Sequence, residues 1–193
     1  MKSLVEIQQE HRFPTDKGDP HSYLEVYDIL FAPHRATASC ILEIGVKRGG
    51  SLSLWDRYFD HAEVIGVDID EISLPTMPRN KIIGYRANAY RPETVQMLRR
   101  EVGQVDIIID DGSHQPRDMR FVAEHYSPMI QKGGLLIIED LGAKRRGGGF
   151  LTIEECREAI MTGLPTWLRR KTMLIDRRYI SGRGDDVLFV VSM

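Results

Sequence analysis

The sequence predicts an α/β fold with a doubly wound, mostly parallel sheet that ends in an antiparallel pair of strands. Five short runs are rich in Val, Ile and Leu and rarely alternate with polar residues, which is typical of parallel strands buried on both faces. Segments with helical character separate these runs. A turn-rich segment, 181–185, joins two final strand candidates, and this favours an antiparallel pair.

Strands and helices alternate between residues 40 and 141. The predicted parallel strands cover 40–46, 63–69, 81–87, 105–110 and 134–138. The predicted helices between them cover 51–60, 92–101 and 116–130. A short helix over 24–31 is expected before the sheet, and Pro33 ends it.

The region after residue 150 departs from this alternation. A helix is predicted over 152–161, with Thr152 as its N-cap. Strands over 172–180 and 186–192 follow it. We therefore expect one domain over 1–193, made of an N-terminal arm over 1–38 and a Rossmann-like core over 39–193.

Composition and charge exclude several classes of protein. The 193 residues are 42% hydrophobic and 28% charged, as in globular domains rather than disordered chains. A formal net charge of −2 gives no reason to expect nucleic acid as a partner. Cys40 and Cys156 lack the spacing of a disulfide scaffold or a zinc ribbon. The apolar runs are too short to span a bilayer, and the acidic first residues do not resemble a signal peptide. We therefore expect a cytoplasmic protein without a membrane partner.

A glycine loop lies where the first predicted strand turns into the first helix. Gly45 and Gly49 are separated by three residues, and Ser51 opens the helix. A dinucleotide fingerprint needs the spacing G-x-G-x-x-G, which this loop misses. The loop resembles instead the E/D-x-G-x-x-x-G loop of class I S-adenosylmethionine (SAM)-dependent methyltransferases. On that resemblance, Gly45, Gly49 and Ser51 are expected to contact the cofactor.

Asp68 ends the second predicted strand. A carboxylate at this position can accept hydrogen bonds from both hydroxyls of a ribose. The alternative is that Asp68 only caps the following segment. The glycine loop and the acid together, in this order, predict a ligand of the adenosine type.

Acidic residues follow two further strands that should be neighbours in the sheet. Asp110 and Asp111 end one strand, and Glu139 and Asp140 follow the other. Ligands of open parallel sheets bind beyond the carboxyl ends of the strands, and crowded carboxylates repel each other unless a cation lies between them. Asp111, Glu139 and Asp140 are therefore predicted ligands of a hard divalent ion, Mg²⁺ above all. The alternative is a purely structural role.

His114 comes directly after the first acidic pair. A histidine beside a bound metal can take the proton of a substrate hydroxyl, which makes His114 and Asp111 the predicted catalytic residues. The alternative is that Ser113 or His114 caps the helix that starts near Pro116.

Several of these motifs together resemble the metal-dependent sugar O-methyltransferases of macrolide and related antibiotic biosynthesis. The resemblance covers roughly residues 13–141, and its most specific parts are the sequences DDGSH at 110–114 and IEDL at 138–141. The other matching positions are Glu43–Gly45, Asp68, Lys132–Gly134, Thr15–Gly18, His21, Tyr23 and Tyr27. It implies Mg²⁺ ligands at Asp111, Glu139 and Asp140, a general base at His114, and cofactor-site acids at Glu43 and Asp68.

The remaining site predictions concern the N-terminal arm and one further acid. We expect the segment around Lys17 and Tyr23 to form a flap over the cofactor, with Lys17 near the cofactor carboxylate. The alternative is an ordinary surface arm. Asp110 is also assigned to the cofactor site. The chain departs from the family after Leu141, where residues 142–149 are basic and rich in glycine. Within it, the run Gly147–Gly149 fits either a lid hinge or a disordered loop.

The expected function is SAM-dependent, Mg²⁺-assisted O-methyl transfer to a hydroxyl of a sugar or another small metabolite. Two alternatives stay open: a nicotinamide-dependent oxidoreductase, against which the glycine spacing argues, and a non-catalytic protein with a SAM-binding fold. Exposed strands near the C-terminus make a homo-oligomer possible.

Overall fold

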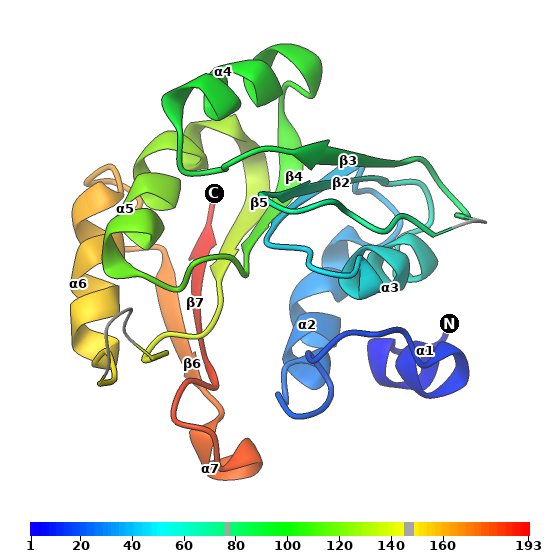
Figure 1. The fold of residues 1–193 in the computed structure, drawn as a ribbon, viewed down its shortest axis with the longest axis horizontal. Coiled ribbons are helices and arrows are strands. Elements are labelled where there is room, and N and C mark those ends of the chain that lie inside the picture. The colour runs from blue at the N-terminus through cyan, green and yellow to red at the C-terminus, as the bar shows by residue number, and fades with distance from the viewer. Residues whose placement is uncertain (76–77, 145–148) are drawn as a thin grey trace.

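A seven-stranded sheet forms the centre of the computed structural model, which describes residues 1–75, 78–144 and 149–193 (Figure 1). The strand order is β3-β2-β1-β4-β5-β7-β6, with β1 to β5 parallel and the last two pairings antiparallel. The strands are β1 (Cys40–Ile44), β2 (Glu63–Asp68), β3 (Ile82–Arg86), β4 (Val105–Asp110), β5 (Ile130–Ile138), β6 (Thr172–Asp176) and β7 (Val187–Ser192). The predicted fold class is confirmed, including the antiparallel pair at the C-terminus.

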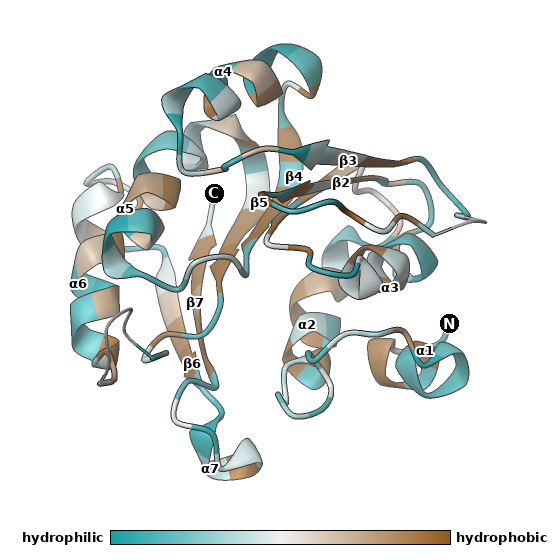
Figure 2. Ribbon diagram, viewed as in Figure 1, coloured by the Kyte–Doolittle hydropathy of each residue, from teal (hydrophilic) through white to brown (hydrophobic). Residues whose placement is uncertain are grey.

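Helices cover both faces of this sheet. One face carries α1 (Leu4–His11), α2 (Leu24–Phe31) and α3 (Gly50–Tyr58), and the other carries α4 (Pro92–Glu101), α5 (Pro116–His125) and α6 (Ile153–Gly163). Successive residues of a strand point to opposite faces, so Ile107 and Ile109 pack under the first set and Ile108 under the second. Figure 2 shows the hydrophobic strands enclosed between helices of mixed hydropathy.

Several element boundaries differ from the predictions for identifiable reasons. The predicted helix 116–130 stops at His125 and gives way to the 3₁₀ turn η2 (Ser127–Met129), because Pro128 lacks the backbone N–H that a helix needs. The predicted strand 172–180 stops at Asp176, and the short helix α7 (Arg178–Ser181) follows. A second 3₁₀ turn, η1 (Ala32–His34), extends α2 through Pro33.

Helix α1 was not predicted, although its sequence carries a start signal. The Ser3 hydroxyl accepts the Glu6 backbone N–H, and the Glu6 carboxylate accepts the Ser3 backbone N–H. This reciprocal capping satisfies backbone donors that a helix start otherwise leaves free. Buried Leu4 and Ile7 then hold the helix against the rest of the molecule.

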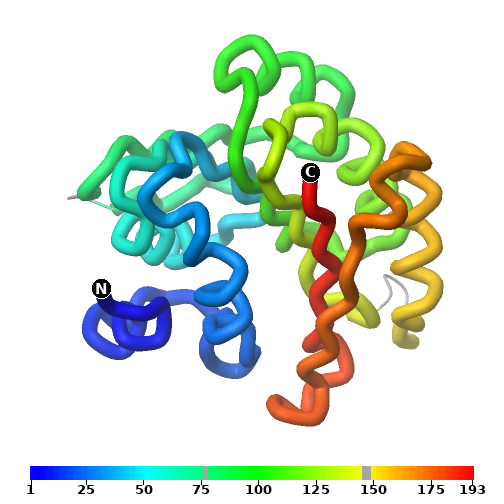
Figure 3. Tube along the Cα trace, turned by 180° about the vertical axis from the view of Figure 1, so that it is seen from behind, coloured from blue at the N-terminus to red at the C-terminus, as the bar shows by residue number. Residues whose placement is uncertain are grey.

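The parallel register aligns the carboxyl ends of the central strands. Asp110 of β4 pairs with Ile44 of β1 on one side and with Ile138 of β5 on the other. Figure 3, from behind, shows the C-terminal strands beside this centre, with β6 as the edge strand. Within the described ranges, every helix is too short or too polar to cross a bilayer.

Candidate active site

Backbone hydrogen bonds continue past the strand ends and place three loops side by side. The Asp111 N–H donates to Ile44 O and the Glu139 N–H donates to Asp110 O, both at 2.9 Å. The first residues after β1, β4 and β5 therefore lie in one row. This is the sheet edge at which the strand order reverses, between β1 and β4, where ligands of such sheets bind.

A cavity of about 1040 Å³ opens at this edge. It is lined by half of the predicted site residues, namely Gly45, Ser51, Asp68, Asp111, His114 and Asp140. The other predicted residues are not part of its lining, namely Lys17, Tyr23, Glu43, Gly49, Asp110 and Glu139. Residues 14–16 and Asp19 also border the cavity, so part of the N-terminal arm does reach it.

The glycine loop lets the backbone come unusually close to the neighbouring loop. Gly45 has a φ of +82°, and a Cβ atom there would lie 2.2 Å from the carbonyl oxygen of Asp111. A side chain cannot fit, so glycine is required at this position. Gly49 has a φ of +69° and faces the carbonyl oxygen of Ser73 rather than the cavity. Its role is thus to shape the loop.

Asp68 holds the glycine loop in place. Its Oδ2 accepts the backbone N–H groups of Val46 (2.9 Å) and Lys47 (2.8 Å), and its Oδ1 accepts that of Asp70 (3.0 Å). The capping alternative therefore describes part of what Asp68 does. The carboxylate also lines the cavity, and each of its oxygens can accept more than one hydrogen bond.

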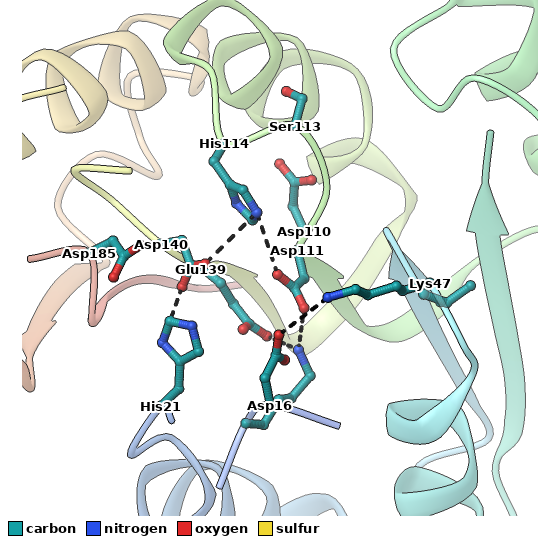
Figure 4. Close-up of polar contacts among 12 residues, drawn as sticks. Asp16, His21, Lys47, Asp110, Asp111, Ser113, His114, Glu139, Asp140 and Asp185 are labelled. Carbon is teal, nitrogen blue, oxygen red and sulfur yellow. Dashed lines mark hydrogen bonds and ion pairs between the residues drawn. The ribbon is translucent and has the colours of Figure 1, made fainter. Parts of the chain in front are cut away.

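The first cluster of possible ligand atoms consists of Asp111, His114 and Asp140 (Figure 4). His114 Nε2 lies 3.8 Å from Asp111 Oδ1 and 3.8 Å from Asp140 Oδ2. His114 and His21 lie on opposite sides of Asp140. Both His114 (φ +53°) and Asp140 (φ +58°) adopt a left-handed backbone that non-glycine residues rarely take. Such conformations persist only where the surroundings enforce them, as at functional sites.

A second cluster lies behind the first and is built around a buried amine. Lys17 Nζ is 2.6 Å from Glu139 Oε1, 2.7 Å from Asp111 Oδ2 and 3.3 Å from Glu43 Oε1. Burial would lower the pKa of Lys17, but these carboxylates raise it well above its usual value. Burial also raises the pKa of Glu43 and of Glu139. Asp111 belongs to both clusters through its two oxygens.

This arrangement places Lys17 and Glu43 behind the cavity lining. Lys17 is 1% exposed, and its amine contacts three carboxylates of the protein, so its contact with a cofactor carboxylate stays a prediction. Glu43 is fully buried, and its Oε2 accepts the indole N–H of Trp55 at 2.9 Å. Neither residue reaches the cavity, because both side chains fill the space behind the strand ends.

Tyr23 and Asp110 are also placed away from the cavity. The Tyr23 hydroxyl donates to Asp140 Oδ1 at 2.7 Å, so this residue contacts a predicted metal ligand. Asp110 accepts a hydrogen bond from the Tyr90 hydroxyl at 2.9 Å. Burial raises the pKa of Asp110 to about 7, and the Tyr90 hydrogen bond lowers it only in part.

Glu139 and Asp140 diverge although they are neighbours in sequence. Glu139 Oε1 accepts hydrogen bonds from Lys17 and from the Tyr27 hydroxyl, whereas Asp140 turns towards His114 and Tyr23. The three acids predicted to share one ion therefore fall into two adjoining clusters linked by Asp111. Burial raises the pKa of Asp140 as well.

Sequence reasoning missed residues that support the acids from a distance. Tyr27 and Trp55 are fully buried, and each donates a hydrogen bond to a site acid. Tyr90 was not singled out, and its hydroxyl also accepts the Ser113 backbone N–H at 2.8 Å. Asp186 was not predicted either. No pattern of spacing marks these residues, because their partners are far away in the chain. Residues 145–148 of the basic glycine-rich segment lie outside the described residues.

Comparison with known proteins adds independent information. No family model matches the sequence. The 8-demethyl-8-alpha-L-rhamnosyl tetracenomycin-C 2'-O-methyltransferase of Streptomyces olivaceus is 36% identical over 137 residues, which cover 67% of this chain and 36% of that protein. The mycinamicin VI 2''-O-methyltransferase of Micromonospora griseorubida is 33% identical over 139 residues, or 67% of this chain and 34% of that protein.

A solved structure matches almost the whole chain. The MycE methyltransferase of mycinamycin biosynthesis, in complex with Mg and SAH (S-adenosylhomocysteine), has a TM-score of 0.75 and 26% sequence identity over 99% of this chain. The match covers 55% of the MycE chain. The chain thus spans about half the length of that structure, and its matched segment spans about a third of the curated relatives.

Proposed function

We propose that this chain transfers a methyl group from SAM to a hydroxyl of a sugar or another small molecule with the help of Mg²⁺. The chain has the class I methyltransferase fold and is homologous to sugar O-methyltransferases of macrolide and tetracenomycin type. The observation that carries the proposal is the cluster of Asp111, His114 and Asp140 at the edge of a cavity that also exposes Gly45 and Asp68.

The cofactor side of the cavity suits a ligand with a ribose and an amino-acid tail. Gly45 and Asp68 both line the cavity, and the Asp68 carboxylate has acceptor capacity for ribose hydroxyls. The sulfonium of SAM supplies a methyl group by in-line displacement, which requires the acceptor oxygen, methyl and sulfur to be aligned. The MycE structure was determined with SAH, which supports a cofactor of this type here.

The chemistry of the first cluster fits a divalent cation. Asp111 Oδ1 and Asp140 Oδ2 lie near the same His114 nitrogen, and burial raises the pKa of Asp140, so a cation there would offset costly negative charge. We propose Asp111 and Asp140 as ligands, and Glu139 as a third through Oε2, because Lys17 and Tyr27 contact only its Oε1. When bound, such a cation lowers the pKa of a coordinated hydroxyl and holds it in position.

His114 is the proposed general base. Its side chain lines the cavity and is partly exposed, so it can reach the hydroxyl of a bound acceptor. Its Nε2 lies 3.8 Å from one oxygen each of Asp111 and Asp140, so it would stand beside a hydroxyl held by a cation on those acids. The acceptor oxygen then bonds to the methyl carbon as the bond from sulfur to that carbon breaks, which leaves SAH and the proton on His114.

The His114→Ala variant tests this proposal. General-base catalysis typically contributes about 10²–10⁴-fold, so turnover on a sugar acceptor is expected to fall by that factor. Isothermal titration should still show SAH binding, because no cofactor contact is removed, whereas NAD should not bind. His61→Ala, on an exposed residue outside the cavity lining, is the matched control. Turnover near the wild-type rate in His114→Ala would show that the base is misassigned.

A further inference from the structure

The N-terminal segment, residues 17–27, contacts the acids at the strand ends through one oxygen of each. Lys17 Nζ donates to Asp111 Oδ2 at 2.7 Å and to Glu139 Oε1 at 2.6 Å. Tyr27 donates to the same Glu139 oxygen. Lys17 and Tyr27 are 1% and 0% exposed, so these contacts are shielded from water. They link residues that are more than ninety positions apart in the sequence.

The same pattern holds for the remaining acid. The Tyr23 hydroxyl donates to Asp140 Oδ1 at 2.7 Å and stays fully buried. In the described part of the chain, no hydrogen bond reaches the second oxygen of Asp111, Glu139 or Asp140. For Asp111 and Asp140 this second oxygen lies 3.8 Å from His114 Nε2. In Asp111 and Asp140, one oxygen is thus bonded to the N-terminal segment, and the other faces the His114 cluster that fits a cation.

The segment itself is anchored at a further point. Asp186, directly before β7, is 0% exposed and accepts the Ser22 hydroxyl at 2.7 Å. Its other oxygen lies 3.1 Å from His21 Nδ1. The Arg177 guanidinium donates to the Ser22 carbonyl oxygen at 3.1 Å. These contacts tie the segment to the C-terminal strand pair.

We propose that Lys17, Tyr23 and Tyr27 are positioning residues that orient Asp111, Glu139 and Asp140 for metal binding. The inference rests on the metal site of the proposed function. Each residue fixes one carboxylate oxygen and thereby sets the direction of the other. Residues 17–27 are then a structural part of the metal site, behind the ligands.

The Tyr23→Phe variant tests the proposal by removing a single hydroxyl. Without that donor the Asp140 carboxylate can rotate, and loss of such an outer contact typically weakens metal binding about 10–100-fold. The full chain is titrated with Mn²⁺ alone, and free Mn²⁺ is measured by electron paramagnetic resonance. We expect the dissociation constant of Tyr23→Phe to rise by about tenfold or more over wild type.

Tyr58→Phe is the matched control, because this buried tyrosine contacts a backbone oxygen, Asp28 O at 3.3 Å, outside the carboxylate clusters. Its Mn²⁺ affinity should equal that of wild type. Equal affinities of wild type and Tyr23→Phe would overturn the inference alone. Failure of the wild type to bind Mn²⁺ would overturn the metal site of the proposed function and the inference with it. Near-ultraviolet circular dichroism verifies that each variant is folded. If Tyr23→Phe does not fold, Tyr27→Phe replaces it, and the same rise in the Mn²⁺ dissociation constant is expected.

Discussion

At the scale of single residues, burial decides the chemistry of the acids at the strand ends. Asp110 and Asp111 are adjacent, yet Asp110 points into the protein towards Tyr90 while Asp111 lines the cavity. Burial raises the pKa of Asp110 from 3.8 to about 7. The folded chain therefore keeps a proton on Asp110 at pH values at which the unfolded chain has lost it.

This proton makes stability depend on pH in a defined direction. Because the folded-state pKa is the higher one, the contribution of Asp110 to stability is lost as the pH rises from about 4 through about 7. Between pH 5 and pH 8 the free energy of unfolding of wild type should fall by roughly 2.5 kcal/mol relative to Asp110→Asn. Urea denaturation at a series of pH values measures this difference. Parallel pH profiles of the two proteins would contradict it.

At the scale of elements, the strands were the most predictable part of the molecule. Runs such as 105–110 match the observed strand because a strand buried on both faces leaves a continuous apolar signature. Helix boundaries depended on local signals, and the capping pair of Ser3 and Glu6 shows that one such signal was overlooked. The glycine loop was placed correctly, but its spacing could not show that Gly45 packs on the Asp111 backbone and Gly49 on the Ser73 backbone.

The close approach at Gly45 predicts a large effect of a single methyl group. Gly45→Ala must adopt an unfavourable positive φ and also displace the Asp111 backbone, which should cost about 3 kcal/mol or more. Gly103→Ala has a similar φ of +80° but no neighbouring atom within 4 Å, so it should cost only about 1 kcal/mol. Chemical denaturation of both variants measures the difference. Equal losses would show that the loop contact is not tight.

At the scale of the whole molecule, the candidate site depends on contacts between distant parts of the chain. The sequence placed the acids at one sheet edge because parallel strands end together, and the register of Ile44, Asp110 and Ile138 agrees with that. The sequence could not predict which acids would be bonded to protein groups. Their partners are Lys17, Tyr23 and Tyr27, which lie between 94 and 122 positions away in the sequence. Such partners follow from three-dimensional packing and leave no local pattern.

The C-terminal strand pair has a comparable long-range role. β7 inserts beside β5, and Asp186 at its start fixes the segment that carries His21 and Ser22. β6 forms the edge of the sheet, with Met173 and Leu174 partly exposed. A homo-oligomer that uses this edge stays a prediction.

The most direct measurement is anomalous diffraction from crystals grown with SAH and Mn²⁺. The account predicts one anomalous peak in contact with Asp111 and Asp140, on the same side of the cavity as His114, with SAH lying along the glycine loop and Asp68. A peak elsewhere, or Asp111 and Asp140 bonded only to protein groups with no ion between them, would contradict the proposed chemistry.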